Sequence, residues 1–353
     1  MNHKRLARVV EAMRKEGLKQ ILVSSTESMY YLTGFYVAPD ERLWALTIDD
    51  DGNCALFGNV LFALDKSRVD VPLYEHTDTD DAVKDIASHV QGGRLGIDKF
   101  WHSKFLISLL EKRPDVVPVL GSAPVDACRM CKDAEEMEVM RKSSLLNDAC
   151  TKKVIESLEI GQTEYAIARK YADCAAEYGC NAGFSLVAFG ANAADPHHGA
   201  GSDALKAGDS IVIDVGLDYN HMQSDMTRTV FMGKPTDFQR KIHDIVLRAN
   251  LAAIAAVRPG VPLKAIDFAA RKVIEDAGYG KYFIHRTGHG IGLSVHEPPD
   301  VSSANEMLAK PGMVFSVEPG IYLPGEIGVR IEDLVCVTED GHEVLNKLTK
   351  EIP

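Results

Sequence analysis

Five side chains in the C-terminal half of the chain are of the types that bind metal ions. Four are carboxylates and one is an imidazole: Asp214 in IDVG, Asp225 in SDMTRT, His289 in GHGIG, Glu318 in VEPG and Glu332 in RIED. Oxygen donors with a single nitrogen donor suit two hard or borderline divalent cations that share bridging oxygens. The set therefore predicts a two-metal site and metal-assisted hydrolysis.

Each acid taken alone has an ordinary explanation, because Asp and Glu before glycine-containing turns are common in turns and helix caps. Four carboxylates that converge on a buried sheet would instead repel one another and lose their hydration. Two divalent cations remove this difficulty, since their combined charge balances the four acids. The imidazole beside oxygen donors favours manganese or cobalt, with iron or zinc as alternatives, over a structural calcium ion.

The spacing of the acids predicts that they face each other in pairs on adjacent strands. Asp214 alternates with apolar neighbours, so in a strand its carboxylate points to the opposite face of the sheet. Asp225 follows after the loop-like segment LDYNHMQS, and Glu318 and Glu332 bracket the turn-rich segment PGIYLPGEIGV. Each pair can therefore lie across two neighbouring strands.

Five of the twelve histidines fall in two short blocks: His285, His289 and His296 in HRTGHGIGLSVHEPP, and His197 and His198 in ADPHHG. Hydrolysis at a carbonyl needs a hydrogen-bond donor for the developing oxyanion and a proton for the leaving amine. We expect His197, His289 and His296 to be functional, the last two because nearby glycines let backbone approach the metals closely. For His198 and His285, functional and structural interpretations stay open.

The elements that must hold these residues repeat along the chain. We expect a helix that begins with a capping box at Asp133, a helix after Thr163, and then two strands. The same order recurs with a capping box at Thr236, a helix near Pro262 and two more strands. The offset is 103 residues from Asp133 to Thr236, 104 from Asp214 to Glu318 and 107 from Asp225 to Glu332. Two copies of one unit would bring the four acids together at the centre of one sheet.

Length and composition indicate a globular protein of two domains. The chain has 353 residues, of which 46% are apolar and 25% charged, and this length suggests about two domains. Residues 1–125 are predicted to form an α/β domain that begins with an amphipathic helix. Its apolar face comprises Leu6, Val9, Val10 and Met13. A boundary in GSAPVDACRMCKD separates it from residues 126–353, and the fold class is α+β.

The same counts bear on partners and location. The net charge of −12 argues against nucleic-acid or anionic-membrane binding, which depends on clustered Lys and Arg. We find no apolar run near the ~18 residues that span a bilayer, and no signal-peptide core. Seven scattered cysteines suit a reducing cytoplasm better than a disulfide framework. Cys128 and Cys131 form a CxxC without a second pair to complete a zinc site, so we interpret them as two thiols near a linker.

The blocks SDMTRT, HRTGHGIGLSVHEPP, VEPG and RIED resemble the signature blocks of metal-dependent peptidases with the creatinase, or "pita-bread", fold (M24 type). The branch that they resemble is that of the Xaa-Pro aminopeptidases and Xaa-Pro dipeptidases (prolidases). The resemblance runs from about Lys132 to the end, and YYLTGF is similar to the smaller amino-terminal domain of the creatinase type. It implies a pseudo-twofold catalytic domain and cleavage of the bond between an N-terminal residue and proline.

The resemblance also implies a division of labour among the metal ligands. Asp214 would bind one of two ions, His289 and Glu318 would bind the other, and Asp225 and Glu332 would bridge both.

Catalytic roles are implied for three residues. His296 would contact the scissile carbonyl and stabilise its oxyanion, and His197 would help to bind the substrate. Glu318 would accept a proton from the nucleophilic water and later donate one to the leaving proline nitrogen, which must be protonated to leave. Residues implied to support the ligands or the substrate are His285, Arg330 and Thr227.

The implied partners are small proline-containing peptides and a second copy of the chain. In the implied homodimer, a loop of the amino-terminal domain reaches toward the neighbour's site. The segment TGFYVAPDERLW, with Asp40, Glu41 and Arg42, is the candidate loop.

One departure from the pattern bears on specificity. Some prolidases carry an arginine four residues after the histidine that corresponds to His296, where it binds the free carboxylate of a dipeptide. This chain has Asp300 there, which would repel that carboxylate unless another cation substitutes. The leading hypothesis is therefore an aminopeptidase P-like Xaa-Pro peptidase. The alternatives are a strict Xaa-Pro dipeptidase and a non-catalytic peptide-binding protein of the same fold.

Overall fold

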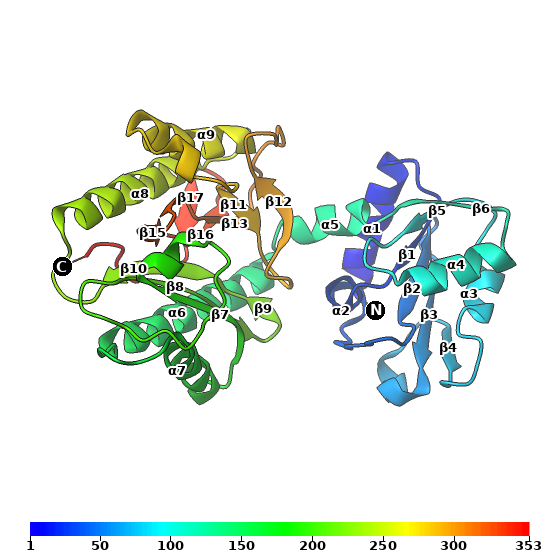
Figure 1. Ribbon diagram of the computed structural model, residues 1–353. Helices are drawn as coiled ribbons and strands as arrows, with labels where there is room; N and C mark the ends of the chain where they lie inside the picture. Colours follow the sequence, from blue (N-terminus) through cyan, green and yellow to red (C-terminus); the bar gives the residue numbers. More distant parts are fainter. Residues whose placement is uncertain (353) are drawn as a thin grey trace. The chain divides into compact units, whose positions relative to one another are not determined.

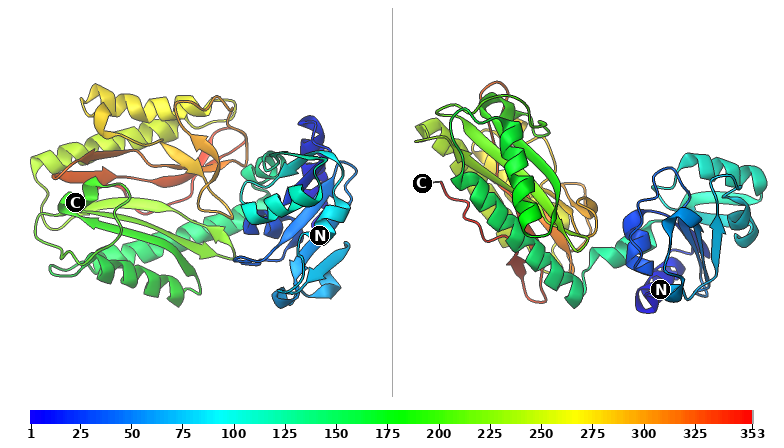
Figure 2. Two further views of the ribbon diagram at one scale, coloured as in Figure 1. Left: turned by 45° about the vertical axis from the view of Figure 1, so that its right-hand side comes forward. Right: turned by 90° about the horizontal axis from the view of Figure 1, so that it is seen from below.

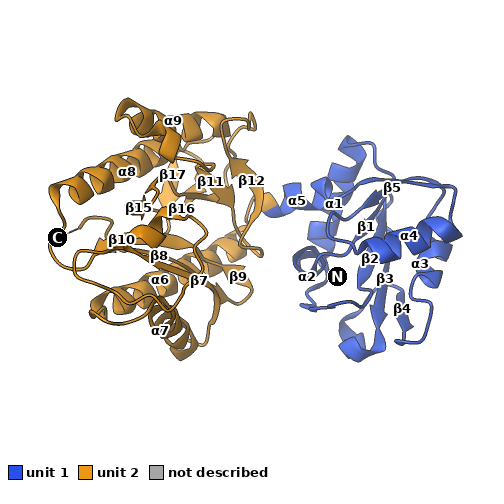
Figure 3. Ribbon diagram, in the orientation of Figure 1, with its two compact units in different colours: residues 1–129 blue, residues 130–353 orange. Residues whose placement is uncertain are grey.

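A computed structural model describes residues 1–352, and the chain divides into two compact units, Met1–Arg129 and Met130–Pro353 (Figure 3). The predicted domain boundary after residue 125 falls inside helix α5 (Ala123–Met130) and stays a prediction. Both units contain helices and sheets, with a mixed sheet in the first unit and antiparallel sheets in the second, and the predicted α+β class is confirmed.

The first unit contains one six-stranded sheet with the strand order β4-β3-β2-β1-β5-β6 (Figure 1). Its strands are β1 (Gln20–Val23), β2 (Ala45–Asp49), β3 (Cys54–Asn59), β4 (Leu73–His76), β5 (Gly93–Ile97) and β6 (Val116–Leu120). Its other helices are α1 (His3–Lys15), α2 (Thr26–Thr33), α3 (Lys84–His89) and α4 (Ser103–Lys112). The predicted apolar face of α1 is confirmed, because Leu6, Val9, Val10 and Met13 are all buried.

The second unit begins with two helices and a sheet of order β10-β8-β7, to which β9 adds by pairing with β8. These elements are α6 (Ala134–Glu156), α7 (Glu164–Glu177), β7 (Asn181–Phe189), β8 (Ser210–Tyr219), β9 (Met222–Gln223) and β10 (Met226–Phe231). A short 3-10 helix, η3 (Gly190–Ala194), follows β7. The segment LDYNHMQS, expected to be a loop, thus carries the end of β8 and all of β9.

The second half of this unit repeats the order with α8 (Asp237–Ala256) and α9 (Leu263–Asp276). Its strands are β11 (Gly288–Gly290), β12 (Glu297–Val301), β13 (Val314–Val317), β14 (Gly320–Leu323), β15 (Ile327–Arg330), β16 (Asp333–Val337) and β17 (His342–Val344). Five of them form a sheet of order β12-β11-β13-β16-β17, and β14 and β15 form a hairpin.

Matching helix starts support the predicted repeat. Both expected capping boxes are present: the side chains of Asp133 and Thr236 accept hydrogen bonds at the starts of α6 and α8. Fourteen residues after each of these N-cap residues, a buried asparagine of the helix forms a hydrogen bond to the sheet. Asn147 Nδ2 donates to Val215 O, and Asn250 Nδ2 donates to Val317 O. The two halves therefore fix their long helices to the ligand-bearing strands in the same way.

The predicted pairing of the acids on neighbouring strands is confirmed, with one correction. Strands β8 and β10 are antiparallel, as are β13 and β16. The four acids do not lie on one hydrogen-bonded sheet, however, because β8 and β10 belong to one sheet and β13 and β16 to another. Only Asp214 lies within a strand, and the expected strand GVRIEDLVCV breaks at Glu332 into β15 and β16. At this break, Glu332 N donates to Thr227 O in β10, so the two sheets meet where the ligands are.

Helices α6 and α7 lie on one side of the strands of this unit, and α8 and α9 lie on the other (Figures 1 and 2). Each helix pair has its own apolar core: one joins α6 and α7 to β7 and β8, and the other joins α8 and α9 to the strands of the second half. The strands between the two helix pairs, and the residues next to them, carry polar side chains into the space between the two cores.

Across residues 1–352, every helix is too short or too polar to cross a lipid bilayer. All seven cysteines lie within these residues and are free thiols, including Cys128 and Cys131 of the CxxC.

Candidate metal centre

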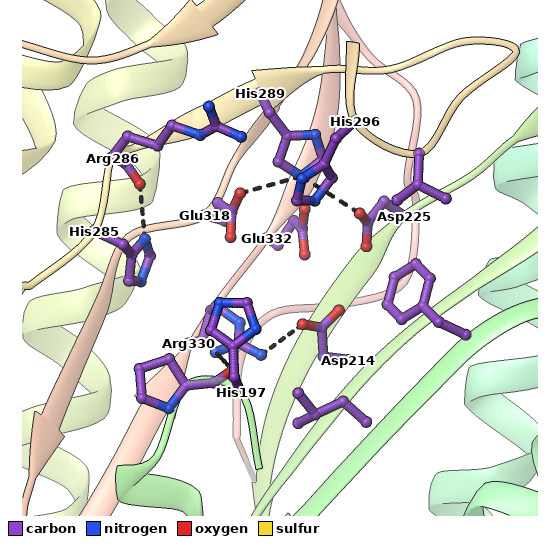
Figure 4. A pocket seen from close by; sticks show the side chains of 14 residues that line it. His197, Asp214, Asp225, His285, Arg286, His289, His296, Glu318, Arg330 and Glu332 are labelled. Carbon is purple, nitrogen blue, oxygen red and sulfur yellow. Dashed lines mark hydrogen bonds and ion pairs between the residues drawn. The ribbon is translucent and has the colours of Figure 1, made fainter. Parts of the chain in front are cut away.

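Nine of the ten predicted site residues line one cavity of about 300 Å³ in the second unit. They are His197, Asp214, Asp225, His285, His289, His296, Glu318, Arg330 and Glu332. The tenth, Thr227, is fully buried behind the ligands, where its hydroxyl donates to Glu332 Oε2 at 2.7 Å. Figure 4 shows the four carboxylates pointing into the same space, Asp214 from β8 and the others from positions next to strand ends.

Three of the predicted ligands are already close enough to share an ion. Asp225, His289 and Glu332 each offer a ligand atom, and these atoms lie within 4.8 Å of one another. His289 Nε2 is 3.6 Å from Asp225 Oδ2 and 3.4 Å from Glu318 Oε1. Asp214 lies outside this group and contacts Arg330 Nη2 through Oδ2 at 2.5 Å.

Three carboxylate oxygens without hydrogen-bond partners in the described part of the chain show whether the site fits metal ions. Asp214 Oδ1, Asp225 Oδ1 and Glu332 Oε1 are buried and have no hydrogen-bond partner within residues 1–352. A buried carboxylate oxygen without a partner is costly. Divalent cations held by these oxygens would remove that cost, so the donor set fits them.

The ring of His289 is oriented for ligation. Its Nδ1 lies 3.1 Å from Gly290 O, and a proton donated there leaves the lone pair of Nε2 facing the carboxylates. Burial lowers the pKa of His289 to about 4, so the ring is neutral, as a ligand must be. Ser316 Oγ accepts from His289 N and donates to Glu318 Oε1 at 2.9 Å, which ties two predicted ligands together.

The glycines around His289 serve neighbouring strands instead of an approach to metals. A Cβ on Gly288 would lie 1.8 Å from Ser316 O, and one on Gly290 would lie 2.4 Å from Pro298 O. Larger residues at either position would push β11 away from the strands beside it. Our interpretation of the GHGIG loop is therefore corrected: the glycines allow close packing that places His289.

The ring of His296 lies beside that of His289, with the ring centroids 3.8 Å apart. Burial, followed by the neighbouring His289, lowers its pKa to about 4. A neutral imidazole in this position can donate a hydrogen bond to an oxygen in the cavity without bringing a second positive charge.

Arg330 lines the cavity and is held by a polar network that includes Tyr322. Besides Asp214, the buried Arg330 guanidinium donates to Tyr322 Oη at 2.9 Å, Thr227 Oγ1 at 3.2 Å and Pro196 O at 3.3 Å. His285 Nε2 is 2.8 Å from the same Tyr322 hydroxyl. His285 thus belongs to this network and also lines the cavity.

Two comparisons with known families and proteins bear on this geometry. The family description "Metallopeptidase family M24" matches residues 138–339, more than half of the chain. The description "Creatinase/Prolidase N-terminal domain" matches residues 5–131. An uncharacterized peptidase of Staphylococcus aureus is 34% identical over 98% of this chain and 99% of its own. The chain belongs to metallopeptidase family M24.

Solved structures of this M24 metallopeptidase's relatives have the same fold. A prolidase from Thermococcus sibiricus aligns with a TM-score of 0.95 and 31% identity, covering 100% of this chain and 99% of that one. An X-Pro aminopeptidase from Thermotoga maritima aligns with a TM-score of 0.81 and 29% identity, covering 97% and 99%. The resemblance inferred from the signature blocks is confirmed. The enzyme is a metal-dependent peptidase.

The loop that carries His197 is held by a buried glutamate in α7. Glu164 is fully buried, and its carboxylate accepts from Phe189 N at 2.9 Å, His198 Nε2 at 2.8 Å and Gly201 N at 2.8 Å. His198 is thus a tether of the loop, while its neighbour His197 lines the cavity.

Replacing Glu164 by Gln is expected to destabilise the M24 enzyme by about 2–3 kcal/mol, because the amide replaces one accepting oxygen with an NH2 donor that faces buried donors. The loosened loop should also raise KM more than it lowers kcat, since His197 would no longer be held beside the cavity. Denaturant unfolding and steady-state kinetics measure the two effects. Unchanged stability in Glu164→Gln would contradict the tethering role.

In the metal-free M24 enzyme, burial and then neighbouring carboxylates raise the pKa values of Asp225 and Glu332 well above their ordinary range. Above the unfolded pKa of about 4, the folded state then binds more protons than the unfolded state, so stability falls as pH rises. As pH rises above about 4, we expect the chelated protein to lose thermal stability relative to the chelated Asp225→Asn, Glu332→Gln double variant. Unfolding followed by circular dichroism would contradict this if the difference did not change with pH.

The sequence did not single out several residues of this M24 site. Phe184, Leu186 and Val295 give the cavity an apolar wall, and Arg286 adds a cation. A hint of Arg286 was present, because it follows His285 in the HRTG block. Asp300, expected to face a dipeptide's carboxylate, is not among the residues that line the cavity, and its carboxylate accepts from Ser302 Oγ.

Proposed function

We propose that this M24 metallopeptidase binds two divalent cations and hydrolyses the bond between an N-terminal residue and proline. The observation that carries the proposal is the convergence of four carboxylates and the neutral His289 on one cavity, with three buried carboxylate oxygens unpartnered within residues 1–352. A cluster of this kind needs positive charge, and two divalent ions balance four acids. Manganese or cobalt suits the donor set, with iron or zinc as alternatives.

The proposed ligand roles follow the family pattern. Asp214 would hold one ion, His289 and Glu318 would hold the other, and Asp225 and Glu332 would be shared between them. When bound, such a pair of ions supplies Lewis acidity and makes water a nucleophile near neutral pH. Thr227 and Arg330 keep Glu332 and Asp214 in place through the contacts described above.

The remaining steps belong to residues of the chain. His296 donates a hydrogen bond to the scissile carbonyl oxygen as negative charge develops on it. Glu318, held by Ser316, accepts a proton from water and returns one to the proline nitrogen, a secondary amine that leaves only when protonated. His197 steadies the peptide from the opposite wall, and the apolar side chains of Phe184, Leu186 and Val295 exclude water.

A strict Xaa-Pro dipeptidase is the second candidate, and a specific observation favours it. Asp300, which would repel the carboxylate of a dipeptide, is not among the residues that line the cavity, whereas Arg286 is. The prolidase among the solved relatives is consistent with this candidate.

Metal-loaded enzyme should be assayed with Ala-Pro, Ala-Pro-Ala and Ala-Ala-Ala. We expect cleavage of the two proline peptides at the Ala-Pro bond and at least about tenfold weaker cleavage of Ala-Ala-Ala. Turnover of Ala-Pro alone identifies the dipeptidase. Failure with a wide Xaa-Pro panel would contradict catalysis and favour a peptide-binding protein of this fold.

A homodimer and a cytoplasmic location are also proposed. Within the first unit, Arg42 of the candidate dimer loop forms an ion pair with Asp78 at 2.9 Å, while Asp40 has a positive φ of 49°. The free cysteines support a reducing compartment. Sedimentation of the purified protein tests the dimer.

A further inference from the structure

The cavity is lined by two guanidinium groups that differ in their surroundings. Arg330 is buried and fully engaged with Asp214, Tyr322, Thr227 and Pro196 O. Arg286 is exposed to the cavity, and among residues 1–352 its guanidinium forms no hydrogen bond or ion pair. A lining cation without a protein partner is free to bind a ligand.

The backbone that carries Arg286 is held firmly on both sides. Its carbonyl oxygen is 2.7 Å from His285 Nδ1, and His285 O accepts from Arg271 Nη2 at 3.0 Å. On the other side, Thr287 donates to the buried Asp267 through its N at 3.1 Å and its Oγ1 at 2.8 Å. The guanidinium therefore extends from a firmly held backbone at the wall of the cavity (Figure 4).

The carboxylates that line the cavity do not neutralise the positive charge of Arg286 when the proposed ions are bound. With two divalent ions bound, as proposed above, the four carboxylates are balanced, and Arg330 adds a positive charge of its own. Asp300, the next acid along the chain after this block, has its carboxylate bound by Ser302 Oγ and is not a lining residue. The loaded cavity is thus positive at the position of Arg286, and the complementary ligand group is an anion.

We propose that Arg286 is a specificity-determining residue that binds a carboxylate of the peptide substrate. The inference rests on the proposed function, because an Xaa-Pro peptide is the ligand considered. A planar guanidinium binds a carboxylate through two parallel N–H···O bonds. Two parts of such a peptide can supply that group: the free carboxylate of a dipeptide's proline, or an acidic side chain on the residue before proline.

Two matched substrate pairs separate these sources. Ala-Pro and Ala-Pro-amide differ only in the C-terminal carboxylate. Glu-Pro-amide and Gln-Pro-amide differ only in the side-chain carboxylate. We expect metal-loaded enzyme to prefer the anionic member of one pair by about tenfold to hundredfold in kcat/KM, mainly through KM, which is the scale of one charge-assisted contact.

Arg286→Gln should reduce that preference to less than about threefold while cleavage of the neutral member continues, and Arg286→Lys should keep part of it. Arg258→Gln is the matched control, because Arg258 is also an exposed arginine of the same unit and does not line the cavity. The control should keep the wild-type preference. Equal kcat/KM values within both pairs for wild type, or an unchanged preference in Arg286→Gln, would overturn the proposal.

A binding measurement tests the role of Arg286 independently of the proposed peptidase activity. Calorimetry would compare wild type and Arg286→Gln with Ala-Pro and Glu-Pro-amide analogues whose scissile carbonyl is reduced to a methylene, and with their neutral counterparts. Loss of the anion preference on substitution supports the role of Arg286, and its retention overturns it. If no peptide is cleaved, the proposed function fails, and the binding comparison still decides on Arg286.

Discussion

Replacing Asp225 or Glu332 by Ala is expected to abolish peptidase activity and to lower the metal content of the purified enzyme. Each residue is proposed to bridge both ions, so its loss weakens two binding sites at once. Both side chains are buried among the other ligands, and one oxygen of each is unpartnered within residues 1–352. The loss in kcat/KM should exceed about 10⁴-fold, beyond the scale of losing one oxyanion donor.

Elemental analysis after gel filtration measures the metal content, and unfolding curves show that the variants are folded. Asp225→Asn and Glu332→Gln preserve size and should behave like the Ala variants. Asp300→Asn is a matched control, because Asp300 pairs with His289 in the strand register while its carboxylate binds Ser302. Full metal occupancy in Asp225→Ala would contradict the bridging role.

Replacing His296 by Ala is expected to lower kcat by roughly 10²–10³ while both ions stay bound, the range for removal of one oxyanion donor. The ring of His296 lies beside that of His289, but His296 is not one of the proposed metal ligands. His296→Gln keeps a donor of similar reach and should recover part of the rate. A decrease of less than about threefold in the Ala variant, or a loss of metal, would argue against the assignment.

Much of the catalytic unit could be predicted because its signals are local. Capping boxes at Asp133 and Thr236 begin the two long helices. The similar offsets of 103 to 107 residues between matching helix starts and acids indicated the repeat. Alternation around Asp214 placed it on a strand with its carboxylate away from the core. These features depend on neighbours within a few residues, which the sequence displays directly.

What could not be predicted depends on long-range contacts. The break between β15 and β16 at Glu332 forms where Thr227 meets it from the other half of the unit. Glu164 binds His198 and Gly201 across more than thirty residues, so the sequence could not show that His198 is a tether. The family resemblance placed Asp300 where some prolidases have a carboxylate-binding arginine, but the sequence could not show that its carboxylate contacts Ser302 and does not line the cavity, whereas Arg286 does.

The most direct test is a titration of chelator-stripped enzyme with Mn²⁺, in which bound metal and hydrolysis of Ala-Pro and Ala-Pro-Ala are measured together. The account predicts negligible turnover without metal and full activity at two bound ions per chain. Activity that survives complete removal of metal, or that reaches its maximum with one ion bound, would contradict a pair of cations held by these five ligands.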